Sequence, residues 1–381
     1  MIPYLQLQAC YFAGSGLAVA ALDWAWGRRE ALRESPARRA AAVLATLAIV
    51  LLAWALAVRH FDHSHSTYQF ISIAIGFYAG LIWVPLATLV RALRKPRRPP
   101  LAAGAFAVLA TGQYALWIEP DRLVTNTHEL RVAAWSPGEP LRVVHVSDLQ
   151  TVGACDRELR AAELVNAFAP DLIVYTGDFV AGPFFDAEPG IAAARRFFEA
   201  LKRPRLGIVC VMGHSESERV RARVLDGLNV IYLRDEEVLL DCGKGRRLRI
   251  FGSKTQFVGT DLSRFDCRVE PGLATFFVSH EPDLGYEIDG RRVDLHLAGH
   301  THGGQIALPF FGPPFTLSDL PARFARGLHR FGDHWLHVNP GIGMEGNHAP
   351  RIRFWCPPEV DLLLLDGGGE STAASPGTAG G

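Results

Sequence analysis

The chain has 381 residues, and its 39 Lys plus Arg are balanced by 39 Asp plus Glu, so its formal net charge is zero. This balance lacks the basic excess that is typical of nucleic-acid-binding proteins, and we expect no nucleic-acid partner. Hydrophobic residues make up 49% of the chain and the mean hydropathy is +0.12, which excludes disorder throughout. The length predicts more than one domain.

The first 120 residues contain four uncharged apolar runs, which predict an all-α transmembrane region. The predicted helices are 2–22, 40–58, 68–90 and 101–118. Each has about the 20 residues that a helix needs to cross a bilayer. Four such runs in succession argue against buried helices of a soluble protein. A signal peptide is the alternative for the first run, but the run lacks a basic start.

The joints between these runs predict their orientation. Joints 28–39 and 91–98 are rich in Arg and Lys, whereas joint 59–67 has only Arg59 beside His60, His63 and His65. The positive-inside rule places the two basic joints in the cytoplasm. We therefore expect a multi-pass protein of the cytoplasmic (inner) membrane, with the lipid bilayer as a partner and the rest of the chain on the extracytoplasmic side. The runs lack charged residues, which argues against a transport function.

After a predicted linker at 121–140, residues 141–366 predict an α/β domain. Strands at 141–146, 172–175 and 206–211 alternate with helices at 156–168 and 191–201, as in a parallel sheet. The second half is strand-rich, with strands expected at 238–240, 248–251, 275–278, 293–297, 335–338 and 360–365. Two β-rich halves with helices outside predict a layered sandwich. The Gly-rich and Ser-rich tail at 367–381 is predicted to be disordered.

Polar residues follow the predicted strands. Asp148, Asp178 and His214 come directly after the first three strands, and we expect them to converge because parallel strands end at one edge of a sheet. Three further histidines follow later strands: His280, His300 and His302. Carboxylates and imidazoles are ligands that first-row divalent metals use. The sequence therefore predicts a metal site at these strand ends.

Other histidines are predicted to have structural roles. His145 lies inside a strand and is more typical of a core histidine, while His329, His334 and His337 are more typical of surface or packing positions. The histidines at 60–65 are more typical of an exposed turn than of a metal site. None of the six cysteines forms a CxxC pair, so no zinc finger is expected.

Five segments resemble the motifs of the calcineurin-like metallophosphoesterases, in the order of that family. They are Ser147–Gln150, Thr176–Asp178, Met212–Glu216, Ser279–Asp283 and Gly299–Gln305, the last reading GHTHGGQ. The late stretch 339–360 resembles the membrane-associated, YkuE-like branch of the family. The resemblance implies a metallophosphoesterase-type α-β-β-α sandwich and a metal-dependent phosphoric ester hydrolase.

The resemblance also implies a site with two divalent ions, Mn²⁺ first, with Fe, Zn²⁺ or Mg²⁺ as alternatives. One ion would be held by Asp148, Asp178 and His302. The other would be held by Asp178, His280, His300 and a ligand from the third motif, so that Asp178 bridges the two. A bridging water or hydroxide would attack a phosphate monoester, diester or pyrophosphate. The bilayer location favours a lipid-linked phosphate as substrate, with a phosphorylated small molecule as the alternative.

Two positions depart from the family pattern. Gln150 replaces the His of the first motif, and its neutral amide suits Mn²⁺ or Mg²⁺ better than zinc. In the third motif, the in-register alignment makes His214 a metal ligand in place of Asn, and Ser215 replaces the His that assists the leaving group. A one-residue slip would instead make His214 the acid. The flanking Gly213 and Glu216 favour the in-register interpretation.

These residues predict a membrane-anchored phosphoesterase with His214 and Asp178 as candidate catalytic residues and with Gln150 among the metal ligands. Without the family's acid, a good leaving group, as in an aryl diester or a pyrophosphate, is favoured. The alternative is a weakened or inactive protein that binds a phosphorylated ligand or partner at the membrane. The apolar segment Phe310–Phe315 is expected either to touch the bilayer or an acyl chain, or to plug a long loop.

Overall fold

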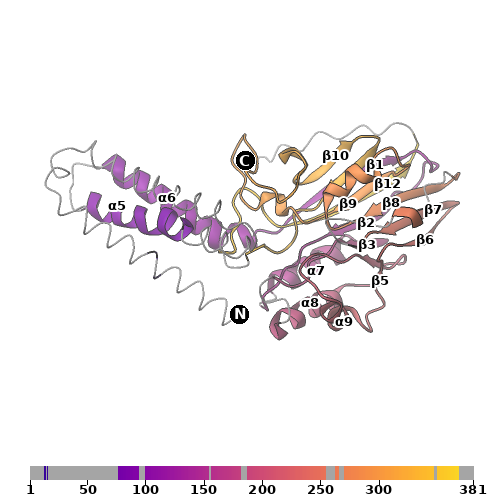
Figure 1. The fold of residues 1–381 in the computed structure, drawn as a ribbon, viewed down its shortest axis with the longest axis horizontal. Coiled ribbons are helices and arrows are strands. Elements are labelled where there is room, and N and C mark those ends of the chain that lie inside the picture. Colours follow the sequence, from indigo (N-terminus) through magenta and orange to yellow (C-terminus); the bar gives the residue numbers. More distant parts are fainter. Residues whose placement is uncertain are drawn as a thin grey trace. The chain divides into compact units, whose positions relative to one another are not determined.

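A computed structural model describes residues 13, 15, 76–93, 99–153, 156–181, 187–254, 262–265, 270–346 and 350–368 (Figure 1). They fall into two compact units, which we describe separately. The first comprises Met1–Ile118 with Gly346–Ile352, and the second comprises Glu119–Glu345 with Arg353–Gly381. Apart from residues 13 and 15, the predicted helices 2–22 and 40–58 lie outside the described residues. So do the joint at 59–67 and the tail from 369 onward.

The described part of the first unit is helical. A π-helical segment, η1 (Tyr78–Trp83), runs into α5 (Val84–Leu93), and both pack against α6 (Pro99–Trp117). Gly112 permits close packing, because a Cβ there would lie 3.3 Å from the Leu81 carbonyl oxygen. Among the described residues, one helix, Pro99–Asp121, is long and apolar enough to cross a membrane, and Tyr78–Val90 is shorter. The described residues thus support one of the four predicted spanning helices, at 101–118. The predicted helix at 68–90 is described only from residue 76.

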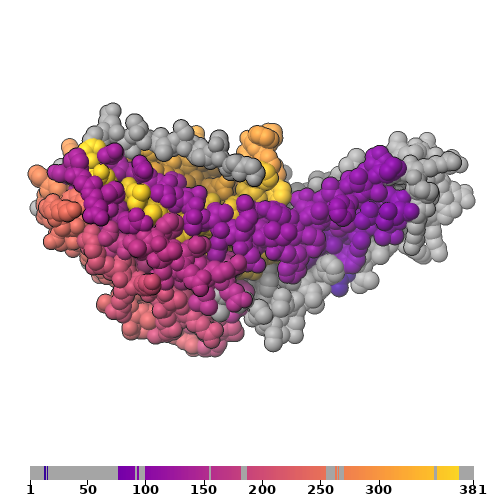
Figure 2. All heavy atoms as spheres, turned by 180° about the vertical axis from the view of Figure 1, so that it is seen from behind, coloured from indigo at the N-terminus to yellow at the C-terminus, as the bar shows by residue number. Residues whose placement is uncertain are grey.

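The second unit contains two six-stranded sheets. The first has the order β1-β12-β2-β3-β4-β5. Its strands are β1 (Val124–Val132), β2 (Leu141–Val146), β3 (Leu172–Tyr175), β4 (Ile208–Cys210), β5 (Ile231–Tyr232) and β12 (Glu359–Gly367). Strands β2 to β5 are parallel, while β12 runs antiparallel to β2 and parallel to β1. In Figure 2, atoms of β12 (yellow) emerge beside those of β1 (purple), so strands from both ends of the unit are neighbours in this sheet.

Strand β1 corrects the prediction that residues 121–140 form a linker. Its side chains alternate between exposed and partly buried, because it lies at the edge of the sheet and covers the core with one face only. The exposed face carries Thr125, Thr127, Glu129 and Arg131. These polar residues hide the strand from a search for apolar runs, and its partner β12 lies more than 200 residues away.

The second sheet has the order β10-β11-β9-β8-β7-β6. Its strands are β6 (Glu236–Gly243), β7 (Arg246–Gly252), β8 (Leu273–Val278), β9 (Leu295–Ala298), β10 (Gly327–Phe331) and β11 (His334–Val338). The central strands β7, β8, β9 and β11 are parallel, and the two edge strands are antiparallel to their neighbours. The loops after β8 and β9 therefore emerge at the same end of the sheet, beside the carboxyl ends of both strands.

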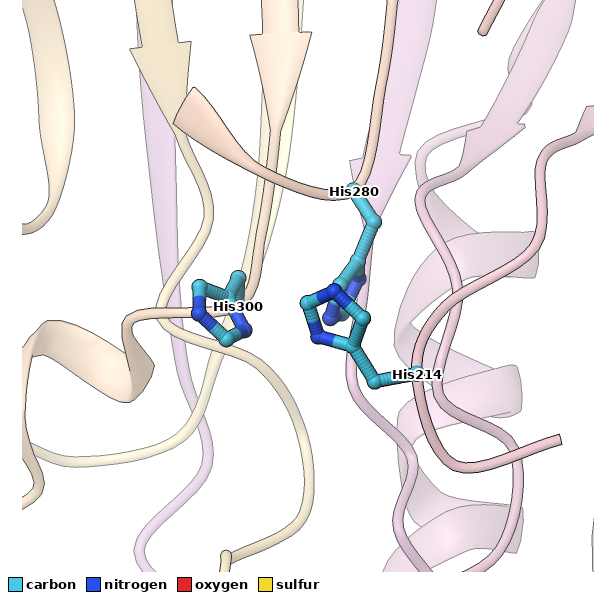
Figure 3. A group of neighbouring side chains, drawn as sticks. All are labelled: His214, His280 and His300. Carbon is cyan, nitrogen blue, oxygen red and sulfur yellow. The ribbon is translucent and has the colours of Figure 1, made fainter. Parts of the chain in front are cut away.

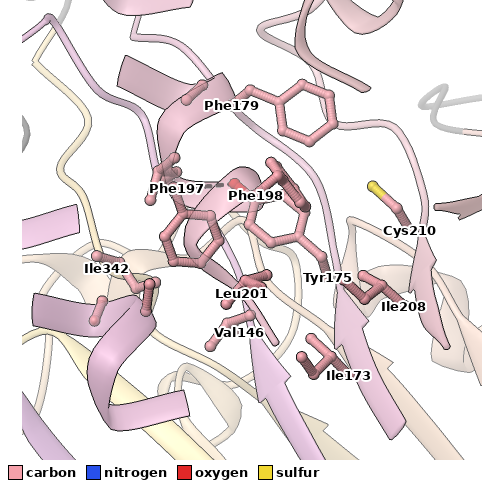
Figure 4. Packing of buried hydrophobic residues seen from close by; sticks show 14 of the residues in the cluster. Val146, Ile173, Tyr175, Phe179, Phe197, Phe198, Leu201, Ile208, Cys210 and Ile342 are labelled. Atoms are coloured by element: carbon pink, nitrogen blue, oxygen red, sulfur yellow. Dashed lines mark hydrogen bonds between the residues drawn. The ribbon is translucent and has the colours of Figure 1, made fainter. Parts of the chain in front are cut away.

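Apolar residues divide the unit into layers. Helices α7 (Asp156–Ala167), α8 (Glu188–Ala200) and α9 (Glu218–Leu225) cover one face of the first sheet, where Val146, Tyr175 and Phe197 are buried (Figure 4). The opposite face packs on the second sheet through residues such as Val143 and Leu295. The short helices η4 (Pro282–Leu284) and α10 (Gly285–Ile288) contribute to the outer layer. The predicted α/β class is confirmed.

Candidate metal centre

The predicted site residues lie on loops at strand ends, and their backbone is unusual. Asp148, Gln150, Asp178, His300 and His302 all have positive φ, between 32° and 68°. A non-glycine residue in the left-handed region costs of the order of 1 kcal/mol or more and persists only where its surroundings impose it. Such strain is concentrated at functional sites. The strained loops therefore direct these side chains toward the site, whereas an unstrained turn would direct them elsewhere.

Two glycines let the backbone come close to the carboxylates. A Cβ on Gly299 would lie 2.3 Å from Asp148 Oδ2, and a Cβ on Gly213 would lie 2.1 Å from Asp178 Oδ1. Both distances are far below van der Waals contact. Any larger residue at either position would displace the carboxylate, so these glycines belong to the construction of the site.

Asp178 is held from several sides. Its Oδ1 accepts a hydrogen bond from the Ser215 N–H at 2.8 Å, and its Oδ2 accepts one from Gln150 Nε2 at 2.9 Å. Oδ2 also lies 3.4 Å from His280 Nε2. Burial alone would raise the pKa of Asp178, but the adjacent His280 outweighs this effect and holds the pKa well below its usual value. The carboxylate is therefore fixed in its ionised form.

Asp148 faces a different histidine. Its Oδ2 accepts hydrogen bonds from the Ser147 hydroxyl and from the His300 N–H, the latter at 3.0 Å. Its Oδ1 lies 3.4 Å from His302 Nε2 without a hydrogen bond between them. Complete burial raises the pKa of Asp148 to about 7. This carboxylate thus lacks a positive partner adequate to its burial.

The imidazoles are oriented by main-chain carbonyl groups. The Nδ1–H of His280 donates to the Thr176 carbonyl at 2.7 Å, and the Nε2–H of His300 donates to the Leu317 carbonyl at 3.0 Å. A neutral ring would then carry its lone pair on the other nitrogen, as a metal ligand requires. Against the lowering effect of burial, the neighbouring Asp178 and Asp148 raise the pKa of His280 to about 10, so a cation that binds Nε2 of His280 would have to displace its proton. His302 is buried, and neither of its ring nitrogens has a hydrogen-bond partner within the described parts of the chain.

His214 joins this group. Figure 3 shows its ring together with those of His280 and His300, each from a different strand-end loop, and one nitrogen from each ring lies within 4.8 Å of the others. The ring centroids of His214 lie 5.0 Å from His280 and 4.8 Å from His300. His214 Nε2 is hydrogen-bonded to the Glu281 carboxylate. His214 therefore lies where the in-register alignment expects a ligand.

The Ser215 hydroxyl is hydrogen-bonded to a neighbouring carboxylate. Its hydroxyl donates to Glu216 Oε2 at 3.2 Å. Glu216 Oε1 in turn accepts the N–H of Gly213 at 2.8 Å and that of Asp178 at 3.0 Å. Glu216 thus closes the turn that carries the third motif, and Ser215 is part of that turn. Sequence reasoning used Glu216 only to align the motif and did not assign it this role.

Gln150 turns the nitrogen of its amide toward the centre. Nε2 donates to Asp178 Oδ2 at 2.9 Å and to Glu345 Oε2 at 3.0 Å. An amide nitrogen does not bind cations, so Gln150 would ligate a metal only after a half-turn of its amide, which brings Oε1 to the same place. The sequence did not predict Glu345 at the site, because it lies in the late stretch outside the five motifs.

Arg353 is a second residue whose role the sequence did not indicate. It is fully buried and donates to the carbonyls of Pro340 (2.7 Å), Gly341 (3.1 Å) and Gly343 (3.0 Å from Nε). The Gly343 N–H donates to the Asp148 carbonyl at 2.7 Å. Arg353 therefore supports the loop on which the strained backbone of Asp148 rests.

The arrangement fits divalent cations. Two ligands bound about 2.1 Å from one ion lie roughly 3.0–3.5 Å apart. The pairs Asp178–His280 and Asp148–His302 both have this separation, at 3.4 Å, and neither is hydrogen-bonded. Asp148, Asp178 and His280 also form a group whose ligand atoms lie within 4.8 Å. The structure brings the predicted residues together, and their role as ligands stays a prediction.

Residues 141–304 match the family model for the calcineurin-like phosphoesterases. The chain carries a calcineurin-like metallophosphoesterase domain. It is 28% identical to the uncharacterized metallophosphoesterase YkuE of Bacillus subtilis over 293 residues, which cover 72% of this chain and 99% of YkuE. Metallophosphoesterases, as their name says, use metal ions, and the donor set above suits divalent ones.

Two further relatives have named activities. The phosphodiesterase YaeI of Escherichia coli is 26% identical over 205 residues, which cover 51% of this chain and 70% of YaeI. The UDP-2,3-diacylglucosamine pyrophosphatase LpxG of Chlamydia trachomatis is 24% identical over 311 residues, which cover 65% of this chain and 92% of LpxG. Hydrolysis of phosphoric esters or anhydrides thus recurs among the relatives of this chain.

Proposed function

We propose that this protein is a membrane-anchored, divalent-metal-dependent hydrolase of phosphodiesters or pyrophosphates. The observation that carries the proposal is the position of Asp178. This residue forms one group with Asp148 and His280, and His280 forms another with His214 and His300. A carboxylate in this position can serve two ions at once, which is the arrangement of two-metal hydrolytic sites.

When bound, two ions would lower the pKa of a water molecule and offset the charge that builds on the phosphoryl oxygens. The chain supplies the positioning. The Thr176 and Leu317 carbonyls fix the rings of His280 and His300, and the Ser215 N–H fixes Asp178. The mixed oxygen and nitrogen donors suit Mn²⁺, with Fe, Zn²⁺ and Mg²⁺ as alternatives.

The leaving group follows from Ser215. A hydroxyl cannot donate a proton near neutral pH as an imidazole does, and here it is already bonded to Glu216. General acid catalysis is typically worth about 10²–10⁴-fold. We therefore propose substrates whose leaving group needs little protonation, such as a pyrophosphate or an activated diester. A phosphodiesterase and a pyrophosphatase among the relatives support this substrate class.

Two observations favour a bilayer location and a lipid-linked substrate. Helix α6 is apolar and largely exposed, with Phe106 64% and Trp117 71% accessible. Phe310, Phe311, Phe315 and Trp355 are exposed aromatic residues on the segments that flank Gly304 and Ile306, and we call them the aromatic rim. The basic joints of the sequence favour the cytoplasmic membrane, with the hydrolase domain on its extracytoplasmic side.

The aromatic rim is connected to the metal centre. Leu308 and Gly312 pair as a small hairpin, and Phe310 and Phe311 lie at its tip. Leu317, five residues after Gly312, accepts the hydrogen bond from His300. Transfer of exposed aromatic rings from water to a membrane interface is favourable. The hairpin is thus suited to hold an acyl chain, or to touch the bilayer, beside the centre.

The proposal is tested with the full chain in detergent, stripped of metal and then supplied with Mn²⁺. We expect hydrolysis of bis(p-nitrophenyl) phosphate, and of a lipid-linked nucleoside pyrophosphate, that chelation abolishes and Asp178→Asn removes. If the Mn²⁺-loaded protein is no faster than Asp178→Asn on both substrates yet still binds them, the non-catalytic alternative replaces the proposal.

A further inference from the structure

A second group of imidazoles and a carboxylate lies between the two sheets. His128 on β1, His337 on β11 and Asp361 on β12 place their ligand atoms within 4.8 Å of one another. His337 and Asp361 are completely buried, and His128 is half-buried. None of the three belongs to the five family motifs, and none is part of the metal centre described above. We call this group the inter-sheet cluster.

Strand register brings the cluster together. Asp361 pairs across the first sheet with Asn126 on β1 and with His145 on β2, and His128 lies two residues beyond Asn126 on the same face. This face packs against the second sheet, from which β11 contributes His337. Apolar side chains such as Leu130 and Leu363 adjoin this polar group between the sheets. A carboxylate in such surroundings is costly unless a positive charge compensates it.

The cluster has polar atoms that no hydrogen bond satisfies. His128 Nε2 and His337 Nε2 are buried and have no hydrogen-bond partner among the residues that the structure describes. Buried ring nitrogens normally have one. His337 Nε2 lies 3.4 Å from Asp361 Oδ2, the same separation as the ligand pairs of the metal centre. His337 Nε2 is therefore available to a cation at Asp361, and His128 offers a ring nitrogen within 4.8 Å of both.

The carboxylate is oriented but not neutralised. Asp361 Oδ1 accepts from Asn126 Nδ2 at 3.0 Å, and Oδ2 accepts from Asn339 Nδ2 at 2.9 Å. Both donors are neutral amides. Burial, and then the neighbouring Glu359, raise the pKa of Asp361 well above its usual value, and Arg326 pairs with Glu359 at 3.5 Å. The described side chains thus fix the position of Asp361 without supplying a matching positive charge.

One tautomer of His337 presents a lone pair to Asp361. His145 bonds through Nε2 to Thr176 Oγ1 at 3.1 Å and through Nδ1 to His337 Nδ1 at 2.8 Å. If His145 donates to Thr176, it accepts the Nδ1–H of His337. The lone pair of His337 then lies on Nε2, toward Asp361. Metal-binding histidines commonly donate their other ring N–H to a fixed partner in this way.

We propose that His128, His337 and Asp361 bind a structural divalent cation of the zinc type, which joins the two sheets. Two imidazole nitrogens and one carboxylate oxygen are a donor set of zinc, and water completes a tetrahedron. The ion would supply the positive charge that Asp361 lacks and would use the unsatisfied Nε2 of His337. This proposal does not depend on the proposed hydrolase function. The competing arrangement is a proton shared by His337 and Asp361.

The direct test is anomalous diffraction at the zinc edge from crystals of the full chain grown with Zn²⁺. A peak between His128, His337 and Asp361 is expected. Peaks confined to the strand-end centre would overturn the proposal while leaving the hydrolase function intact. Peaks between the sheets alone would support it even if the hydrolase proposal fails. The outcome does not depend on whether any variant folds.

A solution test uses His128→Gln, since His128 is only half-buried and its replacement leaves the apolar core unchanged. After loading with Zn²⁺ and dialysis, the wild-type chain should retain one more zinc per chain than this variant. Zinc should also raise the Tm of the wild-type chain more than the Tm of His128→Gln. Thr127→Gln, on the exposed face of the same strand β1, is the matched control and should behave as wild type. Equal zinc content and equal Tm shifts in wild type and His128→Gln would show that a shared proton suffices.

Discussion

The metal centre and the inter-sheet cluster both consist of Asp and His side chains, but loops hold them in the centre and paired strands hold them in the cluster. In the centre, Asp148, Asp178 and His300 lie on loops with positive φ and are held by close glycines and main-chain carbonyls. In the inter-sheet cluster, His337 and Asp361 lie on regular strands, where pairing fixes their positions. Left-handed non-glycine residues cost about 1–3 kcal/mol each, whereas strand positions carry no such strain.

The comparison indicates what each arrangement is suited to. Candidate ligands on strained loops need outside support, but they lie at the carboxyl ends of parallel strands, where open α/β sheets bind their ligands, and His214 and His300 reach the surface there. Ligands on paired strands need no support, but they are enclosed between sheets and suit only a small occupant. The same chemistry is therefore expected to be functional at the strand ends and structural between the sheets.

The sharpest division between the two regions is expected from a pair of matched substitutions. Asp178→Asn should remove the ions of the metal centre and lower hydrolysis by about 10³-fold or more, because bound ions supply several kcal/mol to the transition state. Asp361→Asn should instead lower zinc content and Tm while leaving the metals of the centre in place. Mass-spectrometric metal counts and rates on bis(p-nitrophenyl) phosphate check both. Loss of the same ions from both variants would contradict the division.

A second prediction concerns the support that only the strained loops require. Arg353→Lys keeps the charge but loses the planar group that holds the carbonyls of Pro340, Gly341 and Gly343. Buried carbonyls left unsatisfied should cost about 3 kcal/mol of unfolding free energy, measured by denaturant titration. Metal affinity at the centre should fall more than affinity between the sheets.

The control for this prediction is Arg326→Lys. Arg326 is partly exposed and pairs with Glu359, and such pairs contribute about 1 kcal/mol or less. A loss in Arg326→Lys as large as that in Arg353→Lys would mean that the general positive charge, and not the support of the Asp148 loop, is what matters.

The difference between the regions also explains what the sequence could predict. The centre is encoded in short contiguous segments such as Gly299–Gln305, where glycines and candidate ligands occur together, so the sequence predicts its residues. The fold class followed from alternating strands and helices. Gln150 was predicted as a ligand, but the partner that its amide selects, Glu345, comes from another segment and needed the structure.

The inter-sheet cluster left no such signal. His128, His337 and Asp361 are single polar residues on three strands that are far apart in the sequence. Their meeting depends on β12 inserting between β1 and β2, a pairing that joins the two ends of the unit. His337 was predicted to be a packing or surface residue, because local sequence gives its burial but not its neighbours. Long-range pairing is the part of the fold that periodicity does not determine.

A third prediction tests the missing acid at the centre. Because Ser215 is bonded to Glu216, the rate should depend steeply on the leaving group, and a p-nitrophenyl diester should react about 10²-fold faster than a phenyl diester. Ser215→His would restore a proton donor and should narrow this gap about tenfold. If the ratio of the two rates were as small in the wild type as in Ser215→His, another residue would already donate the proton. Asp361→Asn should leave the ratio of the two rates unchanged.

The smallest effect is expected at the aromatic rim, which belongs to neither region. Phe310 and Phe311 are 105% and 86% exposed, so replacing both with Ser removes no core contact and should leave Tm within about 1 °C. If the rim contacts a lipid, the double variant should lose about tenfold in kcat/KM on a lipid-linked pyrophosphate and keep its rate on bis(p-nitrophenyl) phosphate. Replacing the exposed Leu239 on β6 with Ser is the matched control and should change neither rate. An equal loss on both substrates would mean that the hairpin acts through Leu317 and His300 on the metal centre, and that the rim is part of its support.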